Sequence, residues 1–207
     1  MAGLAPKPPL RLAVFISGRG SNMQALIDAC AKEDYPAQIA LVLSNNPAAQ
    51  GLERAKAAGI QTIAVNHKDY ENRAAFEQAI LDTLAGYDID LICLAGFMRI
   101  LSPHFIKNWH GAIINIHPSL LPAYKGTDTH VRVLADGGQE SGCTVHFVVP
   151  EVDSGDIILQ RRVDVRAGDT PEILAARILE QEHIAYPEAV LQIADGKIQI
   201  PSKNAVE

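Results

Sequence analysis

The stretch LRLAVFISGRGSNMQALIDACA, residues 10–31, places a short glycine-containing loop between two patterned segments. Residues 10–17 form a largely apolar run, which is typical of a strand buried on both faces of a sheet. Residues 21–31 carry apolar side chains at helical spacing. A buried strand that leads directly into a helix is the unit of a parallel α/β sheet, so this stretch predicts that fold class.

The rest of the chain continues this alternation of apolar strands and helices. Two longer strands come late, and they flank a turn at residues 153–155. We therefore expect an α/β fold with a Rossmann-like, mostly parallel sheet, helices on both faces and an antiparallel addition near the C-terminal half. One domain should span residues 1–207, with 1–9 as a flexible lead-in and 197–207 as a tail. The predicted strands are 10–17, 39–44, 61–66, 90–96, 112–116, 142–149 and 157–165, and the predicted helices are 21–31, 51–58, 73–85, 102–109, 129–136 and 170–194.

Composition narrows the function classes. The chain has 207 residues, is 48% hydrophobic and carries a net charge of −6, with its 18 Lys and Arg scattered. The absence of a basic block argues against nucleic acid as a partner. Its three Cys are widely spaced, which favours a reducing cytoplasm over a disulfide framework. No apolar run approaches the roughly 18 residues of a membrane span, so no membrane partner is expected.

The loop at residues 17–22, SGRGSN, joins the first strand to the first helix. Small residues let backbone N–H groups approach an anion, and a helix N-terminus favours negative charge. The dinucleotide pattern G-x-G-x-x-G would need glycine where Met23 stands, and no GK[ST] sequence is present. This favours a site for one phosphate, helped by Ser21 and Asn22. The alternative is a tight strand–helix turn that one of these two side chains caps.

A second motif, NIHPSLLPAYKG at residues 115–126, lies at the end of another apolar run. Asn115 offers a neutral amide donor suited to a developing oxyanion, and His117 an imidazole that can carry a proton near neutral pH. Residues two apart on an extended segment point the same way, so both can face one cleft. Pro118 and Pro122 would hold this geometry. The alternative is a strand end with an Asx-type turn and a surface histidine.

The third motif is the acidic turn VPEVDSGD at residues 149–156. A carboxylate beside a histidine would orient the ring and stabilise its protonated form, and Asp153 and Asp156 both fit that role on chemistry alone. The alternative is a solvated acidic hairpin turn. The other histidines show no H-E-x-x-H spacing, so no metal is expected. No G-x-S-x-G sequence and no recognisable cysteine nucleophile is present.

Four motifs together, at residues 17–22, 94–101, 115–122 and 151–155, resemble the phosphoribosylglycinamide formyltransferases. Their order and spacing match that family from about residue 10 to residue 196. The sequence N-x-H-P-S-L-L-P with a downstream Asp is specific to the formyltransferase superfamily. The G-x-G-S-N loop narrows the resemblance to the members that act on glycinamide ribonucleotide.

The resemblance implies a reaction in de novo purine (IMP) biosynthesis. The amine of glycinamide ribonucleotide would attack the formyl group of the cosubstrate 10-formyltetrahydrofolate, through a tetrahedral oxyanion intermediate. By similarity, Asn115 would stabilise the oxyanion, while His117 would move protons and stabilise the same charge. Asp153, rather than Asp156, would hold His117, because it occupies the motif position of the family. No metal and no covalent nucleophile is implied.

The resemblance also implies the binding residues. Those for the ribonucleotide are Gly20, Ser21, Asn22 and Glu182. Those for the folate are Arg73, Met98, Arg99, Ile100, Leu101, Asn115, Val149, Pro150, Glu151, Val152 and Asp153. Both substrates are anions, so the site should be locally positive, with Arg19, Arg73, Arg99 and a helix N-terminus as sources. The expected partners are these two small molecules, and the chain would act as a monomer or homodimer.

Three rival functions share parts of this pattern. Methionyl-tRNA formyltransferase has the same core and a C-terminal tRNA-binding domain, which the sequence length and net charge do not favour. Formyltetrahydrofolate hydrolase has the core and an N-terminal regulatory domain, and only about nine residues precede the first strand here. A non-catalytic phosphate-binding regulator of the same fold is the third, and the intact Asn115, His117 and Asp153 argue against it.

Overall fold

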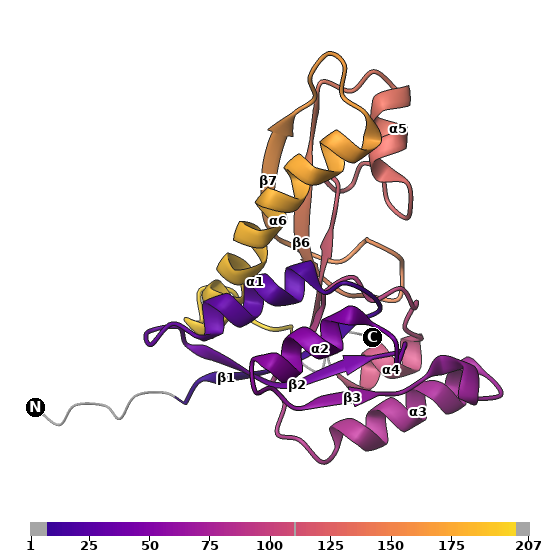
Figure 1. The fold of residues 1–207 in the computed structure, drawn as a ribbon, viewed down its shortest axis with the longest axis vertical. Coiled ribbons are helices and arrows are strands. Elements are labelled where there is room, and N and C mark those ends of the chain that lie inside the picture. Colours follow the sequence, from indigo (N-terminus) through magenta and orange to yellow (C-terminus); the bar gives the residue numbers. More distant parts are fainter. Residues whose placement is uncertain (1–7, 110, 202–207) are drawn as a thin grey trace, which may run out of the picture.

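The computed structural model describes residues 8–109 and 111–201, so the start of the predicted lead-in and the end of the predicted tail lie outside it. Seven strands form one sheet in the order β3-β2-β1-β4-β5-β6-β7 (Figure 1). Strands β1 to β5 pair in parallel, while β6 and β7 add antiparallel. The predicted fold class is confirmed. The strands are β1 (Leu10–Ile16), β2 (Ala37–Ser44), β3 (Thr62–Ala64), β4 (Leu91–Leu94), β5 (Ile113–His117), β6 (Glu140–Phe147) and β7 (Ile157–Asp164).

Helices cover both faces of this sheet (Figure 1). Successive β1 side chains alternate between two apolar cores: Leu12 and Val14 pack with residues of α1, α2 and α6, and Ala13 and Phe15 with residues of α3 and α4. The continuous apolar run of β1 follows from burial on both faces. The helices are α1 (Ser21–Cys30), α2 (Gln50–Ala57), α3 (Arg73–Leu84), α4 (Pro103–Asn108), α5 (Thr129–Ala135) and α6 (Pro171–Ala194).

The helix starts follow local side-chain chemistry. Ser102 caps α4 by accepting the Phe105 N–H, and Thr170 caps α6 by accepting the Ile173 N–H, and in each case a Pro follows at the first helical position. At α1, the capping position is Gly20, and no side chain caps it. The turn that Ser21 or Asn22 would cap is therefore not the arrangement found.

Several strand bounds differ from the predicted ones: β2 starts at residue 37 rather than 39, β4 covers 91–94 of the expected 90–96, and β6 spans 140–147 rather than 142–149. Two further differences have a clear local reason. β3 covers only residues 62–64 of the expected 61–66, because Asn66 instead caps a short 3₁₀ helix, His67–Asp69, by accepting the Lys68 N–H. β5 ends at His117 rather than Ile116, because its last residues pair with antiparallel β6. Asn115 and His117 thus belong to the strand itself and do not follow it.

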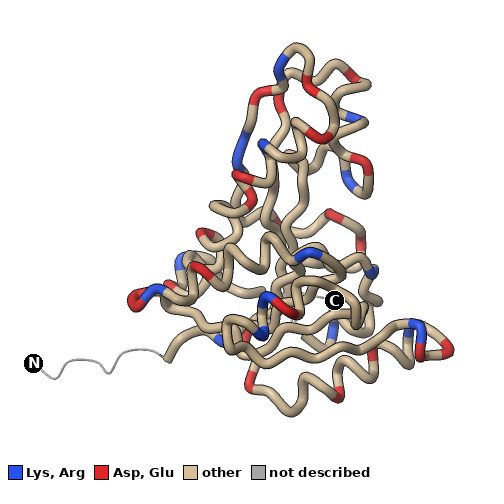
Figure 2. The backbone as a smooth tube through the Cα atoms, in the orientation of Figure 1, with Lys and Arg blue, Asp and Glu red and all other residues tan. Residues whose placement is uncertain are grey.

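Charge is distributed over the whole described backbone. Lys and Arg are interspersed with Asp and Glu along the chain (Figure 2). None of the helices in the described part is both long enough and apolar enough to cross a membrane.

Candidate functional site

A pocket of about 670 Å³ opens beside the carboxyl ends of the parallel strands β4 and β5, next to antiparallel β6. Open α/β sheets bind their ligands at this edge. The pocket is lined by the segment after β4, the end of β5, the start of α5 and the turn after β6. Of the predicted folate-binding residues, it includes Met98, Arg99, Ile100, Leu101, Asn115, Val149, Pro150, Val152 and Asp153.

Large apolar side chains are exposed around this pocket. Met98 and Ile100 are 72% and 64% exposed, and Val131 and Val152 are about half exposed. Apolar side chains gathered at a concave surface mark a site for a ligand with apolar faces. A planar ring system fits such a wall.

Two predicted folate-binding residues lie elsewhere. Arg73 is the first residue of α3, and Glu151 is exposed in the turn after β6. Neither is among the residues that line the pocket. Their contacts with folate stay predictions.

The structure brings His117 and Asp153 together at the pocket. His117 Nδ1 lies 3.4 Å from Asp153 Oδ2, and both side chains are nearly buried. The other ring nitrogen, Nε2, lies 2.9 Å from the Tyr124 carbonyl oxygen. A carbonyl only accepts, so Nε2 carries a hydrogen and donates it. Nδ1, on the other side of the ring, faces the Asp153 carboxylate.

Backbone contacts fix the orientation of Asp153. Its Oδ2 accepts the Gly126 N–H at 2.8 Å, and its own φ is 49°, in the left-handed region. Asp156 is placed differently, at the start of the pairing with β6, where its carbonyl accepts the Phe147 N–H. Asp153 therefore faces His117 and Asp156 does not line the pocket. The residue types alone had left these two carboxylates as equal candidates.

His146 is a site residue that the sequence interpretation missed. It lies on β6 opposite Asn115, and its Nε2 is 3.3 Å from Asn115 Nδ2. Burial lowers the pKa of His146, and its Nδ1 donates to the Phe147 carbonyl at 2.8 Å. Nε2 is then a bare acceptor that fixes the amide orientation of Asn115. The expected strand at residues 142–149 contained His146, but only the register of the sheet places it opposite Asn115.

The distance from His146 Nε2 to Asp153 Oδ1, 3.7 Å, is short enough for an ion pair. Desolvation outweighs the attraction of Asp153, so the pKa of His146 lies below its ordinary value. A neutral His146 that accepts from Asn115 agrees with both the burial and the hydrogen bonds. We name Asn115, His117, His146 and Asp153 the polar cluster.

Backbone strain is concentrated around the polar cluster. In the described chain, three non-glycine residues have positive φ: Tyr124 at 55°, Asp128 at 57° and Asp153 at 49°. Tyr124 contributes the carbonyl bonded to His117, and Asp128 lines the pocket. Such strain persists only where surrounding contacts hold it, and it gathers at functional sites.

The glycine loop, residues 17–22, turns directly into α1. Gly20 has φ 71°, and a Cβ there would lie 3.0 Å from Met23 Cε and 3.1 Å from Gly51 Cα. Gly51, in the first turn of α2, donates its N–H to the Gly18 carbonyl at 3.0 Å. A Cβ on Gly51 would collide with the Ile16 side chain. Gly51 therefore allows α2 to support the loop, a role that no local sequence signal indicated.

Two of the predicted ribonucleotide-binding residues meet across the chain. Asn22 Nδ2 donates to Glu182 Oε2 at 2.7 Å, although the residues are 160 positions apart. Glu182 lies on α6, is 6% exposed, and has a pKa raised by burial. The structure thus joins the start of α1 to the middle of α6, with Gly20 and Ser21 beside this contact in sequence.

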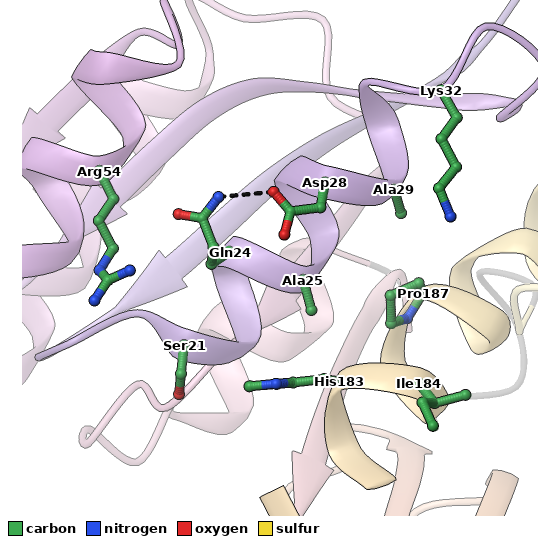
Figure 3. Close-up of a pocket in the computed structure, with 10 residues that line it drawn as sticks. All are labelled: Ser21, Gln24, Ala25, Asp28, Ala29, Lys32, Arg54, His183, Ile184 and Pro187. Atoms are coloured by element: carbon green, nitrogen blue, oxygen red, sulfur yellow. Dashed lines mark hydrogen bonds between the residues drawn. The ribbon is translucent and has the colours of Figure 1, made fainter. Parts of the chain in front are cut away.

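A second groove, of about 490 Å³, adjoins Ser21 and lies between α1, α2 and α6 (Figure 3). Figure 3 shows Gln24 bonded to Asp28 along α1, with Arg54 on one side of the groove and Lys32 on the other. These two cations were not among the expected sources of positive charge. Within the described residues, no group of three or more His, Cys, Asp or Glu is arranged to hold a metal ion.

Comparisons with known proteins agree with this architecture. The formyl transferase family model matches residues 10–190. The phosphoribosylglycinamide formyltransferase of Escherichia coli is 44% identical over 95% of this chain and 92% of its own length. The human trifunctional purine biosynthetic protein adenosine-3 is 49% identical over 97% of this chain, which spans only 20% of that protein.

Solved structures give the same result. Phosphoribosylglycinamide formyltransferase from Brucella melitensis superposes with a TM-score of 0.87 at 47% identity, over 93% of this chain and 99% of that one. Glycinamide ribonucleotide transformylase 1 from Symbiobacterium toebii gives a TM-score of 0.92 at 41% identity, over 98% of this chain and 97% of that one. The fold, the site geometry and these matches lead to one conclusion: the chain belongs to the formyl transferase family.

Proposed function

We propose that this protein transfers the formyl group of 10-formyltetrahydrofolate to the amine of glycinamide ribonucleotide, a step of de novo purine biosynthesis. The observation that carries the proposal is the polar cluster, which sets an oriented amide and a carboxylate-bound imidazole beside a pocket with exposed apolar walls. The similarity to phosphoribosylglycinamide formyltransferases over nearly the whole of both chains supports the substrate assignment.

In the proposed reaction, the amine nitrogen forms a bond to the formyl carbon, and the carbonyl oxygen becomes an oxyanion. Asn115 donates its free amide hydrogen to that oxygen, since its other hydrogen is directed at His146. The proton lost by the amine passes to the folate nitrogen as the carbon–nitrogen bond to the folate breaks. His117 moves that proton, and for this its Nε2 exchanges the Tyr124 carbonyl for the substrate.

Asp153 keeps its bonds throughout this sequence. Its carboxylate faces His117 Nδ1 and is held by the Gly126 amide, so the ring keeps one orientation while it takes and gives a proton. A negative carboxylate also favours the protonated ring. The protein thereby supplies position and charge to groups that the substrates bring.

The substrates are assigned to two neighbouring regions. The ribonucleotide phosphate binds the N–H groups at Gly20, Ser21 and Asn22, at the start of α1, where the helix dipole favours an anion. Glu182 holds the same substrate beside Asn22. The folate ring binds in the pocket, against Met98, Arg99, Ile100 and Leu101, with the turn at residues 149–153 opposite.

The remaining expectations are part of the same proposal. The chain acts as one domain, in the cytoplasm, on small molecules rather than nucleic acid, and as a monomer or homodimer. The mixing of positive and negative residues along the backbone supports the choice of small-molecule substrates (Figure 2).

Turnover tests the proposal directly. Purified protein is mixed with glycinamide ribonucleotide and 10-formyltetrahydrofolate, and product formation is followed. Water alone and a formylatable tRNA serve as alternative acceptors. We expect formylation of the ribonucleotide only, and an Asn115→Ala variant should lose about 10²–10³-fold in kcat, as for other lost oxyanion donors. Faster turnover with water or with tRNA would assign the chain to one of the rival functions.

A further inference from the structure

Ser17, the first residue after β1, connects three loops at the carboxyl edge of the sheet. Its hydroxyl accepts the Met98 N–H at 2.7 Å and donates to Asn45 Oδ1 at 2.6 Å. Its own N–H donates to the Gly96 carbonyl at 3.2 Å. One small side chain thus joins the ends of β1, β2 and β4.

Two of these loops are the proposed substrate-binding segments. The glycine loop begins at Ser17 itself, and Met98 opens the segment 98–101, which lines the pocket. They meet between β1 and β4, where the strand order reverses from 3-2-1 to 4-5. At such a switch point neighbouring loops diverge to opposite faces of the sheet. Besides the backbone bond from Ser17 to Gly96, the Ser17 hydroxyl is what joins the glycine loop to Met98.

The orientation of the Ser17 hydroxyl is fixed. Its hydrogen points to Asn45 Oδ1, which leaves an oxygen lone pair for the Met98 N–H. Asn45 is 4% exposed, and its Nδ2 lies 3.2 Å from His67 Nδ1. Because Asn45 is buried and held by its own contact with His67, the Ser17 hydroxyl has no equivalent alternative partner for its hydrogen.

The far end of the segment 98–101 is fastened independently. Glu77, on α3, is 2% exposed, and its Oε1 accepts the Ser102 N–H at 2.7 Å. The Ser102 hydroxyl also donates to Glu77 Oε2. Polar side chains therefore hold both ends of the segment, half-buried Ser17 at one end and buried Glu77 at the other, while Met98 and Ile100 stay exposed. Only the Ser17 end is shared with the glycine loop.

We propose that Ser17 is a positioning residue that fixes the glycine loop relative to the segment 98–101, so that the amine and the formyl carbon are held at reacting distance. This inference rests on the proposed function. Without the Ser17 hydroxyl, the glycine loop and the segment 98–101 each keep the groups that bind their own substrate. What is lost with the hydroxyl is the relative placement of the two substrates, and a misplacement of about 1 Å can cost about 10²-fold in rate.

Ser44 provides a matched control. It ends β2, the neighbouring strand, and is fully buried, and its hydroxyl bonds only within its own turn, to the Asn46 carbonyl and N–H. Ser17→Ala and Ser44→Ala each delete one hydroxyl at the same edge of the sheet. We expect Ser17→Ala to lower kcat by about 10-fold or more. The kcat of Ser44→Ala should stay within about twofold of the wild-type value, even if its melting temperature falls as far as that of Ser17→Ala.

Ligand affinity separates positioning from folding. The ribonucleotide and a non-reactive folate analogue are titrated separately, and then a single molecule that joins the two ligands covalently. In Ser17→Ala, each separate ligand should bind within about threefold of its wild-type affinity, whereas the joined ligand, which senses both regions at once, should lose about 10-fold or more. Ser17→Thr, which keeps the hydroxyl, should restore most of the kcat and most of the affinity for the joined ligand.

The outcomes are distinct. Equal kcat losses in Ser17→Ala and Ser44→Ala, or equal affinity losses for joined and separate ligands, would show that Ser17 is merely structural. A kcat of Ser17→Ala close to that of the wild type would also overturn the inference. Absence of turnover in the wild type would overturn the proposed function instead. The comparison of joined and separate ligands would then still test whether Ser17 sets the relative position of the two segments.

Discussion

The glycine loop and the polar cluster lie at the same edge of the sheet but are built in opposite ways. The loop is six consecutive residues, and its shape follows from one left-handed glycine before α1. The cluster gathers side chains from β5, β6 and the turn after β6, joined by contacts between residues up to 36 positions apart. The turn of the loop is set by a local glycine, although α2 supports it from outside, whereas the cluster exists only through sheet register.

The backbone conformations of the glycine loop and of the residues around the polar cluster also differ. Glycine adopts φ 71° at Gly20 without a steric penalty, whereas Tyr124, Asp128 and Asp153 hold positive φ with side chains present. Each such residue costs on the order of 1–3 kcal/mol, which surrounding contacts must offset. The bond from Gly126 to Asp153 is one of those contacts. A cluster assembled across the sheet can carry strain that a short loop avoids.

The largest effect that separates the two regions is expected from Asp153→Asn. The change keeps the size of the side chain and removes the charge that faces His117. It should lower kcat by about 10²-fold, within the range for groups that assist proton transfer. Affinity for the ribonucleotide, whose proposed site is the glycine loop, should change little. Steady-state kinetics with each substrate varied in turn measures both quantities.

Asp156→Asn is the control for this change. Asp156 lies three residues further along the same acidic turn, and its side chain is exposed. The change Asp156→Asn should lower kcat much less than Asp153→Asn does. An NMR titration of the His117 ring in both variants adds a direct readout of the neighbouring charge. Equal losses of activity, with identical His117 titrations, would remove Asp153 from the mechanism.

Ser21→Glu should act on the glycine loop alone. A carboxylate at the start of α1 repels a bound phosphate, so ribonucleotide affinity should fall by about 10-fold or more. Folate affinity should stay within about twofold, because Ser21 does not line the pocket proposed for folate. Calorimetric titration of each ligand gives both values. If folate binding fell as far as ribonucleotide binding, the division into two regions would be wrong.

A smaller effect tests whether the polar cluster extends to β6. His146→Leu removes the acceptor that orients the Asn115 amide. One lost hydrogen bond is worth about 1 kcal/mol, so kcat should fall by roughly 5-fold. His104→Leu is the control, because His104 is exposed on α4 and lines neither the pocket nor the second groove. Its kcat should match that of the wild type, and a similar loss in both variants would confine the cluster to Asn115, His117 and Asp153.

The smallest effect concerns stability against pH. Burial lowers the pKa of His130, His146 and His183 below the ordinary value of 6.5. As the pH falls through 6.5, the unfolded chain takes up protons that the folded chain does not, so the free energy of unfolding decreases toward acid. We expect the melting temperature to drop by about 2–4 °C between pH 7.5 and 5.5. A flatter pH dependence in His146→Leu would assign part of that drop to the polar cluster, and an unchanged slope would exclude it.

Local patterns were enough for most of the fold. Apolar runs placed every strand of the described sheet within a few residues, and Ser102 and Thr170 marked two helix starts. These succeeded because burial on two faces and helix capping both depend on residues adjacent in the chain. β3 came out shorter than expected, because an Asn side chain bonded its own backbone in place of the ladder.

The sequence by itself determined the fold class, the family resemblance and the presence of an amide and an imidazole on one strand. The residue types alone left Asp153 and Asp156 open, and only a motif position favoured Asp153. The pairing of Asn115 with His146, the support of Gly51 beneath the glycine loop and the bond from Ser17 to Met98 were decided by tertiary structure. The reason is physical: side-chain periodicity reports which face of an element is buried, but strand register and close backbone approach depend on partners far away in the chain.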